Sequence, residues 1–92
     1  MDTIQDEFEA FHELNPHVMR RLVQMARQAK DRGHHRLGIG MLFEVLRWES
    51  MIDTTSSHGF KLNNDLRSRY ARRIMEDHPD LDGVFETRRL RG

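Results

Sequence analysis

The most apolar part of this 92-residue sequence is the stretch of residues 39–49, IGMLFEVLRWE. When these residues are projected at about 100° per residue, apolar side chains surround nearly the whole helix. Only Glu44 and Arg47 form a narrow polar stripe. A helix that is apolar on almost every side is typical of the centre of a domain. We therefore expect a helix near residues 39–52 at the centre of the fold.

Three further helices are expected around this central one. Their ranges are near 4–13, 16–32 and 64–77, followed by a short helix or turn at 81–85. Asn15 and Pro16 mark the start of the second helix, because asparagine is favoured before the first turn and proline is tolerated within it. Gly33 supplies the left-handed residue that often follows a helix. The fourth helix should end before Pro79, because a residue that precedes proline avoids the helical conformation.

The expected fold is all-α, with residues 1–92 forming a single small domain and residues 56–62 forming at most a small hairpin. The predicted core lines the inner arcs of the helices and contains Phe8, Phe11, Leu22, Ala26, Leu42, Leu46, Leu66, Tyr70, Ile74 and Phe85. Glu49 is an anomaly, because its carboxylate falls on an apolar face and needs a partner there. Arg67 falls in the apolar arc of the fourth helix. We expect these two residues to form a structural ion pair.

Composition excludes several classes of protein. There is no cysteine, which excludes disulfides and thiolate catalysis, and the six histidines lack the spacing of a metal site. Neither a paired nucleophile and base nor a glycine-rich phosphate loop is present, so we expect no enzyme, no catalytic residue, no cofactor and no metal. No apolar run approaches the roughly 20 residues of a membrane span, and the mean hydropathy is −0.77. We expect a cytoplasmic protein.

The charges cancel over the whole chain but are segregated along it. The net charge is zero, with five acidic and no Lys or Arg residues in 1–16, a net +7 in 17–75, and −2 in 76–92. This pattern permits a positive patch in the middle of the chain that binds phosphate. It equally permits the acidic ends to fold back and neutralise that patch.

The predicted helix at 63–77 combines asparagine and arginine, the residue types that contact bases and phosphates in nucleic acids. The candidate contact residues are Lys61, Asn63, Asn64, Arg69, Arg72, Arg73 and Arg36, with Arg20 and Arg27 extending the positive face. With the helix at 39–52 as its support, the arrangement resembles a helix-turn-helix. However, the connection of about ten residues is longer than the three or four of that motif.

The same arginines have a second interpretation. Spacings of four residues within the helix pair Asp65 with Arg69, Arg72 with Glu76, and Arg73 with Asp77. Pairs at this spacing bind to each other on one helix face. The arginines would then form a solvated surface rather than a nucleic-acid interface.

Several stretches together resemble a family of small proteins encoded by bacteriophages and prophages. They are Asn15 with Pro16, residues 38–49, 60–64 and 69–72, the ending 79–81, and residues 85–88. The resemblance covers about residues 8–90. The family has no established activity, so the resemblance implies a setting, a phage accessory protein in the bacterial cytoplasm, and no functional residues.

An alternative function is binding and modulation of a host or phage protein. The acidic first helix carries Phe8 and Phe11 on one side. Such a stripe could dock into a groove of a partner or into a second copy of the chain as a homodimer. Salt dependence separates the two functions, because phosphate binding weakens steeply as ionic strength rises.

Overall fold

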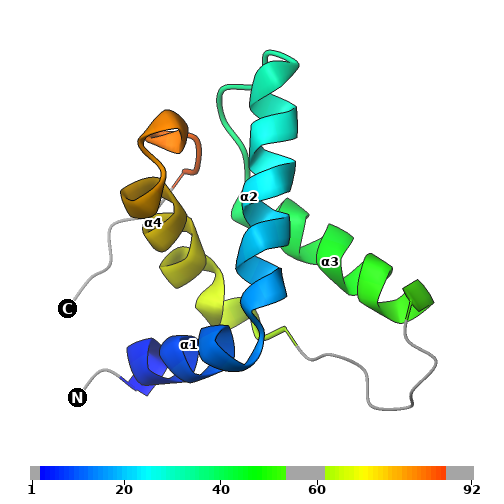
Figure 1. The fold of residues 1–92 in the computed structure, drawn as a ribbon, viewed down its shortest axis with the longest axis vertical. Coiled ribbons are helices and arrows are strands. Elements are labelled where there is room, and N and C mark those ends of the chain that lie inside the picture. The colour runs from blue at the N-terminus through cyan, green and yellow to red at the C-terminus, as the bar shows by residue number, and fades with distance from the viewer. Residues whose placement is uncertain (1–2, 54–61, 87–92) are drawn as a thin grey trace.

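A computed structural model describes residues 3–53 and 62–86 of the chain. The described residues form four α-helices and two short 3₁₀ turns (Figure 1). The elements are α1 (Thr3–Leu14), α2 (Pro16–Asp31), α3 (Ile39–Asp53), η1 (Asn64–Leu66), α4 (Arg67–Asp77) and η2 (Pro79–Leu81). The all-α prediction is confirmed, and each predicted helix is present with its ends shifted by a few residues. The hairpin predicted for 56–62 lies outside the described residues, apart from Leu62.

Most of the helix ends follow from local chemistry. Gly33 has φ of +93°, the left-handed conformation predicted for the residue that ends α2. Asn63 caps η1 as expected, because its side chain accepts a hydrogen bond from the backbone N–H of Asp65. Asn15 precedes α2 as predicted, but its side-chain amide donates backward to the carbonyl of Phe11, at 3.0 Å, and so closes the end of α1.

The long helix α2 lies in the middle of the arrangement (Figure 1). Helix α4 packs against α1, α2 and α3, and α3 also packs against α2. The end of the described chain returns to the α2–α3 connection, where the N–H of Leu37 donates to the carbonyl of Val84 at 2.7 Å. Leu37 and Phe85 form an isolated bridge there, with both side chains buried. The predicted C-terminal turn therefore closes one end of the core.

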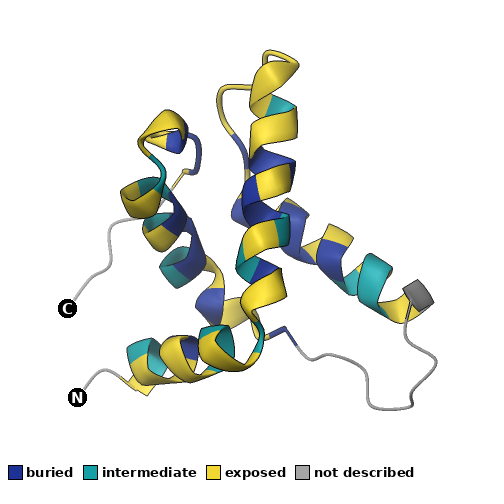
Figure 2. Ribbon diagram, in the orientation of Figure 1, coloured by how far each residue is buried: buried dark blue, intermediate teal, exposed yellow. Residues whose placement is uncertain are grey.

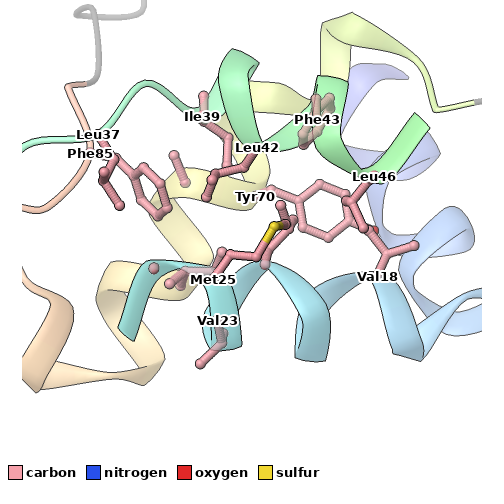
Figure 3. Packing of buried hydrophobic residues seen from close by; sticks show 14 of the residues in the cluster. Val18, Val23, Met25, Leu37, Ile39, Leu42, Phe43, Leu46, Tyr70 and Phe85 are labelled. Carbon is pink, nitrogen blue, oxygen red and sulfur yellow. The ribbon is translucent and has the colours of Figure 1, made fainter. Parts of the chain in front are cut away.

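The core is centred on Tyr70 of α4, which is fully buried. Its ring meets Phe8 of α1 edge to face, with centroids 4.8 Å apart, and Phe43 of α3 at 5.9 Å. Figure 3 shows Tyr70 in the layer between α2 and α3. Every predicted core residue is buried except Phe11, which is only partly buried and packs against the edge of the cluster. The helical periodicity therefore located the inner arcs correctly.

The prediction of a central position for α3 is only half correct. Leu42, Phe43 and Leu46 on one side are buried, but several apolar side chains on the other side are exposed. Helix α3 extends away from the other three helices (Figure 1), and Figure 2 shows buried residues concentrated where the helices meet. In the described part of the chain, α2 and α4 are the helices that pack most extensively against α3. Those neighbours cover one side of it.

Candidate functional site

The candidate site is a row of apolar side chains on the outer side of α3, which we call the α3 face. Its members are exposed to 57% (Met41), 37% (Val45), 59% (Trp48) and 65% (Met51). Their spacings of four, three and three residues place them along one side of the helix. Apart from Leu14 at the end of α1, they are the only large apolar side chains that are exposed in the described part of the chain. Monomeric proteins seldom expose contiguous apolar patches unless these bind something.

One edge of the α3 face carries an ion pair between helices. Arg21 of α2 donates to Glu49 through Nε, at 3.0 Å from Oε2, and through Nη2, at 2.5 Å from Oε1. Each side chain is about one-third exposed. The hydrogen bond from Arg21 lowers the pKa of Glu49, and the same bond raises the pKa of Arg21. The anomalous carboxylate thus has the arginine partner that the sequence requires.

The predicted identity of that partner, Arg67, is wrong. Arg67 is the first residue of α4, where its Nε donates to the carbonyl of Asn64 at 3.0 Å. Its guanidinium lies over Gly40, and a side-chain Cβ at that glycine would meet Nη1 at 3.2 Å. Gly40 lies nine residues before Glu49, roughly 13 Å away along α3. The helical wheel gives the direction of a side chain but not its height along the neighbouring helix.

The other edge of the α3 face carries a second ion pair. Arg47 donates to the carboxylate of Glu44 within the same helix. It also donates to the carbonyl of Leu62, at 2.7 Å, and to the side chain of Asn64. The α3 face is therefore apolar along its middle and has one Glu–Arg pair at each edge. An apolar centre with a polar rim is the usual anatomy of a protein–protein interface.

Most of the described residues that were predicted to contact nucleic acid bind neighbouring side chains instead. Asn63 caps η1 and donates to Glu7 at 2.9 Å, while Asn64 accepts from Arg47. Arg69 and Arg72 are half-buried. Lys61 lies outside the described residues. The asparagine pair therefore stabilises the start of α4 and its contact with α1 rather than projecting freely.

Acidic residues of segment 76–86 pair with arginines of the basic middle segment, once within α4 and twice across the fold. Arg73 pairs with Asp77 at 2.8 Å, as its spacing predicted, and Arg36 pairs with Glu86 at 3.0 Å. Arg27 pairs with Asp80 at 3.0 Å. This hydrogen bond lowers the pKa of Asp80 and raises that of Arg27. Of the two outcomes that the charge pattern permits, the structure shows neutralisation at these three arginines.

Two open hollows lie elsewhere on the surface. One, of about 510 Å³, runs along α2 and is lined by Met19, Arg20, Val23, Gln24, Arg27, Gln28, Asp31 and His78. The other, of about 450 Å³, is lined by Arg72, Met75, Glu76, Pro79 and Asp82. Both are open to solvent, and charged side chains of both signs lie among the apolar groups that line them.

Comparison with protein-family models, with curated proteins and with solved structures finds no match to this chain. Among residues 3–53 and 62–86, no helix has both the length and the apolar character that crossing a membrane requires. The same residues contain no cluster of three or more side chains suited to hold a metal ion. The geometry of the α3 face is therefore the strongest indication of function.

The ion pair beside the α3 face gives a testable prediction. Because Glu49 has a lowered pKa in the folded state, its stabilising effect is present above its ordinary pKa of 4.5 and is lost as the pH falls through the lowered value. We expect Glu49→Gln to lower the free energy of unfolding by at most about 1 kcal/mol at neutral pH, because the pair is partly solvated. The difference from the wild type should vanish in acid.

Urea denaturation followed by circular dichroism at several pH values measures this difference. Glu44→Gln is the matched control, since Glu44 is more than two-thirds exposed and its pair lies within one helix. Its effect should be smaller. A difference between the wild type and Glu49→Gln that persists undiminished at low pH would contradict the assignment of Arg21 as the partner.

Proposed function

We propose that this chain is a protein-interaction domain without catalytic activity, and that it binds its partner through the α3 face. One observation carries the proposal. Met41, Val45, Trp48 and Met51 leave a continuous apolar row open on the most apolar helix of the chain. Covering such a row removes apolar surface from water, which is the main favourable contribution to most protein–protein association.

The surface that binds differs from the one that the sequence suggested. In the alternative function derived from the sequence, the first helix docks through Phe8 and Phe11, but Phe8 is 1% exposed and packs on Tyr70. Helix α1 thus uses its apolar side to complete the domain's own core. The α3 face takes over the role of docking surface, because it is the long apolar row without a neighbour in the described part of the chain.

Nucleic-acid binding stays a prediction from the sequence, as does the phage setting. The geometry favours it less, because Arg36, Arg73 and Asn63 already bind carboxylates within the molecule. A phosphate would have to displace these partners. Exposed ion pairs are weak, so such displacement is feasible, but it removes the advantage of a preformed positive surface.

Hydroxyl-radical footprinting tests the proposed function. Methionine and tryptophan react readily with hydroxyl radicals. The reactivity of Met41, Trp48 and Met51 therefore shows directly whether the α3 face is accessible to solvent. We expect these three side chains to be protected in a concentrated bacterial extract that contains the protein, relative to dilute purified protein. Protection should persist after nuclease treatment. Leu14, which is 80% exposed on α1, is the internal control and should react equally in both samples.

Two results would overturn the proposal. Equal reactivity of the α3 face in extract and in dilute solution would show that it stays open among cellular proteins. Protection that disappears after nuclease treatment would show that nucleic acid covers the α3 face. That result would support the hypothesis of nucleic-acid binding. A mobility-shift assay at low salt with duplex and single-stranded nucleic acid would then measure that binding directly.

A further inference from the structure

The two edges of the α3 face specify the charge of what covers it. One edge carries Glu49 with Arg21, and the other carries Glu44 with Arg47. Each pair is neutral, and Arg67 beside Gly40 adds one positive charge, so the rim has no strong field that would attract a highly acidic or a highly basic partner. An anionic lipid surface favours a face bordered by lysine and arginine, and nucleic acid favours a positive surface. The surface that complements the α3 face is another apolar row with balanced charges at its edges.

We propose that the α3 face binds the α3 face of a second copy of this chain, in an antiparallel homodimer. The inference rests on the proposed function, since it names the partner for the same surface. A two-fold axis makes the contact isologous, so each copy supplies the same residues. The axis passes near Val45 and Trp48, which lie in the middle of the row.

An antiparallel arrangement is favoured by the positions of the charges. A two-fold axis perpendicular to the helices brings the edge with Glu44 and Arg47 against the same edge of the second copy. With the axis midway along the row, Glu44 comes within one helical turn of Arg47 in the second copy, so the two ion pairs form a network of four charges. Antiparallel helices also place opposite dipole ends side by side.

Arg67 adds a further contact to this arrangement. It lies exposed over Gly40, near the N-terminal end of α3. In the antiparallel dimer this end lies beside the C-terminal end of α3 in the second copy. The carbonyl groups at a helix C-terminus favour a nearby cation. Arg67 has no carboxylate partner in the described part of the chain. In the dimer it meets the negative end of a helix dipole.

The small size of the contact favours a reversible dimer over an obligate one. The row from Met41 to Met51 spans roughly 15 Å of helix. A standard interface buries about 800 Å² on each partner, which is more than four side chains supply. The rim pairs must therefore contribute to the contact. We expect a reversible dimer with a Kd in the micromolar range rather than an obligate one.

Sedimentation velocity over protein concentrations from about 1 μM to about 1 mM tests the inference. Trp48 is the chain's sole tryptophan, so its fluorescence gives a second readout from within the contact. We expect the dimer fraction to rise with concentration and the Trp48 emission to shift to shorter wavelength over the same range. A monomer throughout this range, with unchanged emission, would overturn the inference.

Matched lysine substitutions separate the α3 face from general apolar association. Met51→Lys removes an exposed apolar side chain from the row, and Leu14→Lys makes the same change on α1. Both variants retain Trp48, and both should keep the circular dichroism and thermal stability of the wild type. We expect Met51→Lys to raise the dimer Kd by about tenfold or more, and Leu14→Lys to leave it unchanged. Equal effects of the two substitutions would overturn the inference.

Failure of this inference and failure of the proposed function give different results. If the purified protein stays monomeric while the α3 face is protected in extract, the second copy is excluded and a different protein is the partner. If the purified protein stays monomeric and the α3 face is equally reactive in extract, both proposals fall.

Discussion

Replacement of Tyr70 by alanine is expected to lower the free energy of unfolding by about 3–5 kcal/mol, the range seen when large buried aromatic side chains are truncated. Tyr70 is fully buried, and its ring contacts Phe8 from α1 and Phe43 from α3. Its loss leaves a cavity where three helices meet. A small domain has only about 5–15 kcal/mol of stability in total, so the variant should be partly unfolded at ambient temperature. Urea denaturation followed by circular dichroism measures the loss.

Tyr70→Phe is the matched control for this prediction. The Tyr70 hydroxyl is buried and has no hydrogen-bond partner in the described part of the chain. Its removal should leave stability unchanged or raise it by up to about 1 kcal/mol, because an unsatisfied buried polar group is unfavourable. A loss as large as that of the alanine variant would show that the hydroxyl, and not the ring, stabilises the core.

The stability of the wild type and that of Tyr70→Phe should also differ in their pH dependence. The reason is burial, which raises the pKa of Tyr70 above its ordinary value of 10.0. The folded state keeps the phenol neutral, while the unfolded state ionises it at the ordinary pKa. The stability due to the neutral phenol is therefore present below about pH 10 and is lost as the pH rises further. Tyr70→Phe should lack this component of alkaline destabilisation. Tyr70 is the chain's sole tyrosine, so phenolate absorbance reports on it alone.

The second large effect is expected for Phe8→Ala, which should lower the free energy of unfolding by about 3–5 kcal/mol. Phe8 is the buried residue of α1, and its ring meets Tyr70 edge to face at 4.8 Å. Without it α1 loses its main attachment to the domain. Phe11→Ala is the control, because Phe11 is only partly buried and lies farther from Tyr70, at 6.3 Å. Its effect on unfolding, measured by the same method, should be clearly smaller.

This prediction also separates the two candidate docking surfaces. If α1 belongs to the core, Phe8→Ala destabilises the monomer, whereas Met51→Lys weakens association and leaves the fold intact. The opposite outcome is a stable Phe8→Ala variant that no longer associates. It would assign the docking role to α1, which is the alternative that the sequence offered.

Several features of this protein are determined by sequence over short distances. Pro16, Gly33 and Pro79 mark helix boundaries because their backbone preferences act within a turn. The inner arcs of the helices follow from periodicity, since a side chain's direction on a helix depends only on its position along it. These local rules correctly gave the four helices and all but one of the predicted core residues.

Only the tertiary structure decided which apolar side chains stay exposed and which arginine meets Glu49. Residues 39–49 are apolar on nearly every side of the helix, and the sequence does not state how many neighbours the helix will have. The length of the chain is the one feature of the sequence that points to this exposure, because four helices in 92 residues can cover only part of such a helix. Glu49 and its partner Arg21 are 28 residues apart, and Arg27 and Asp80 are 53 apart. Such pairs depend on the relative heights of packed helices, which are set by the whole core and not by any local pattern.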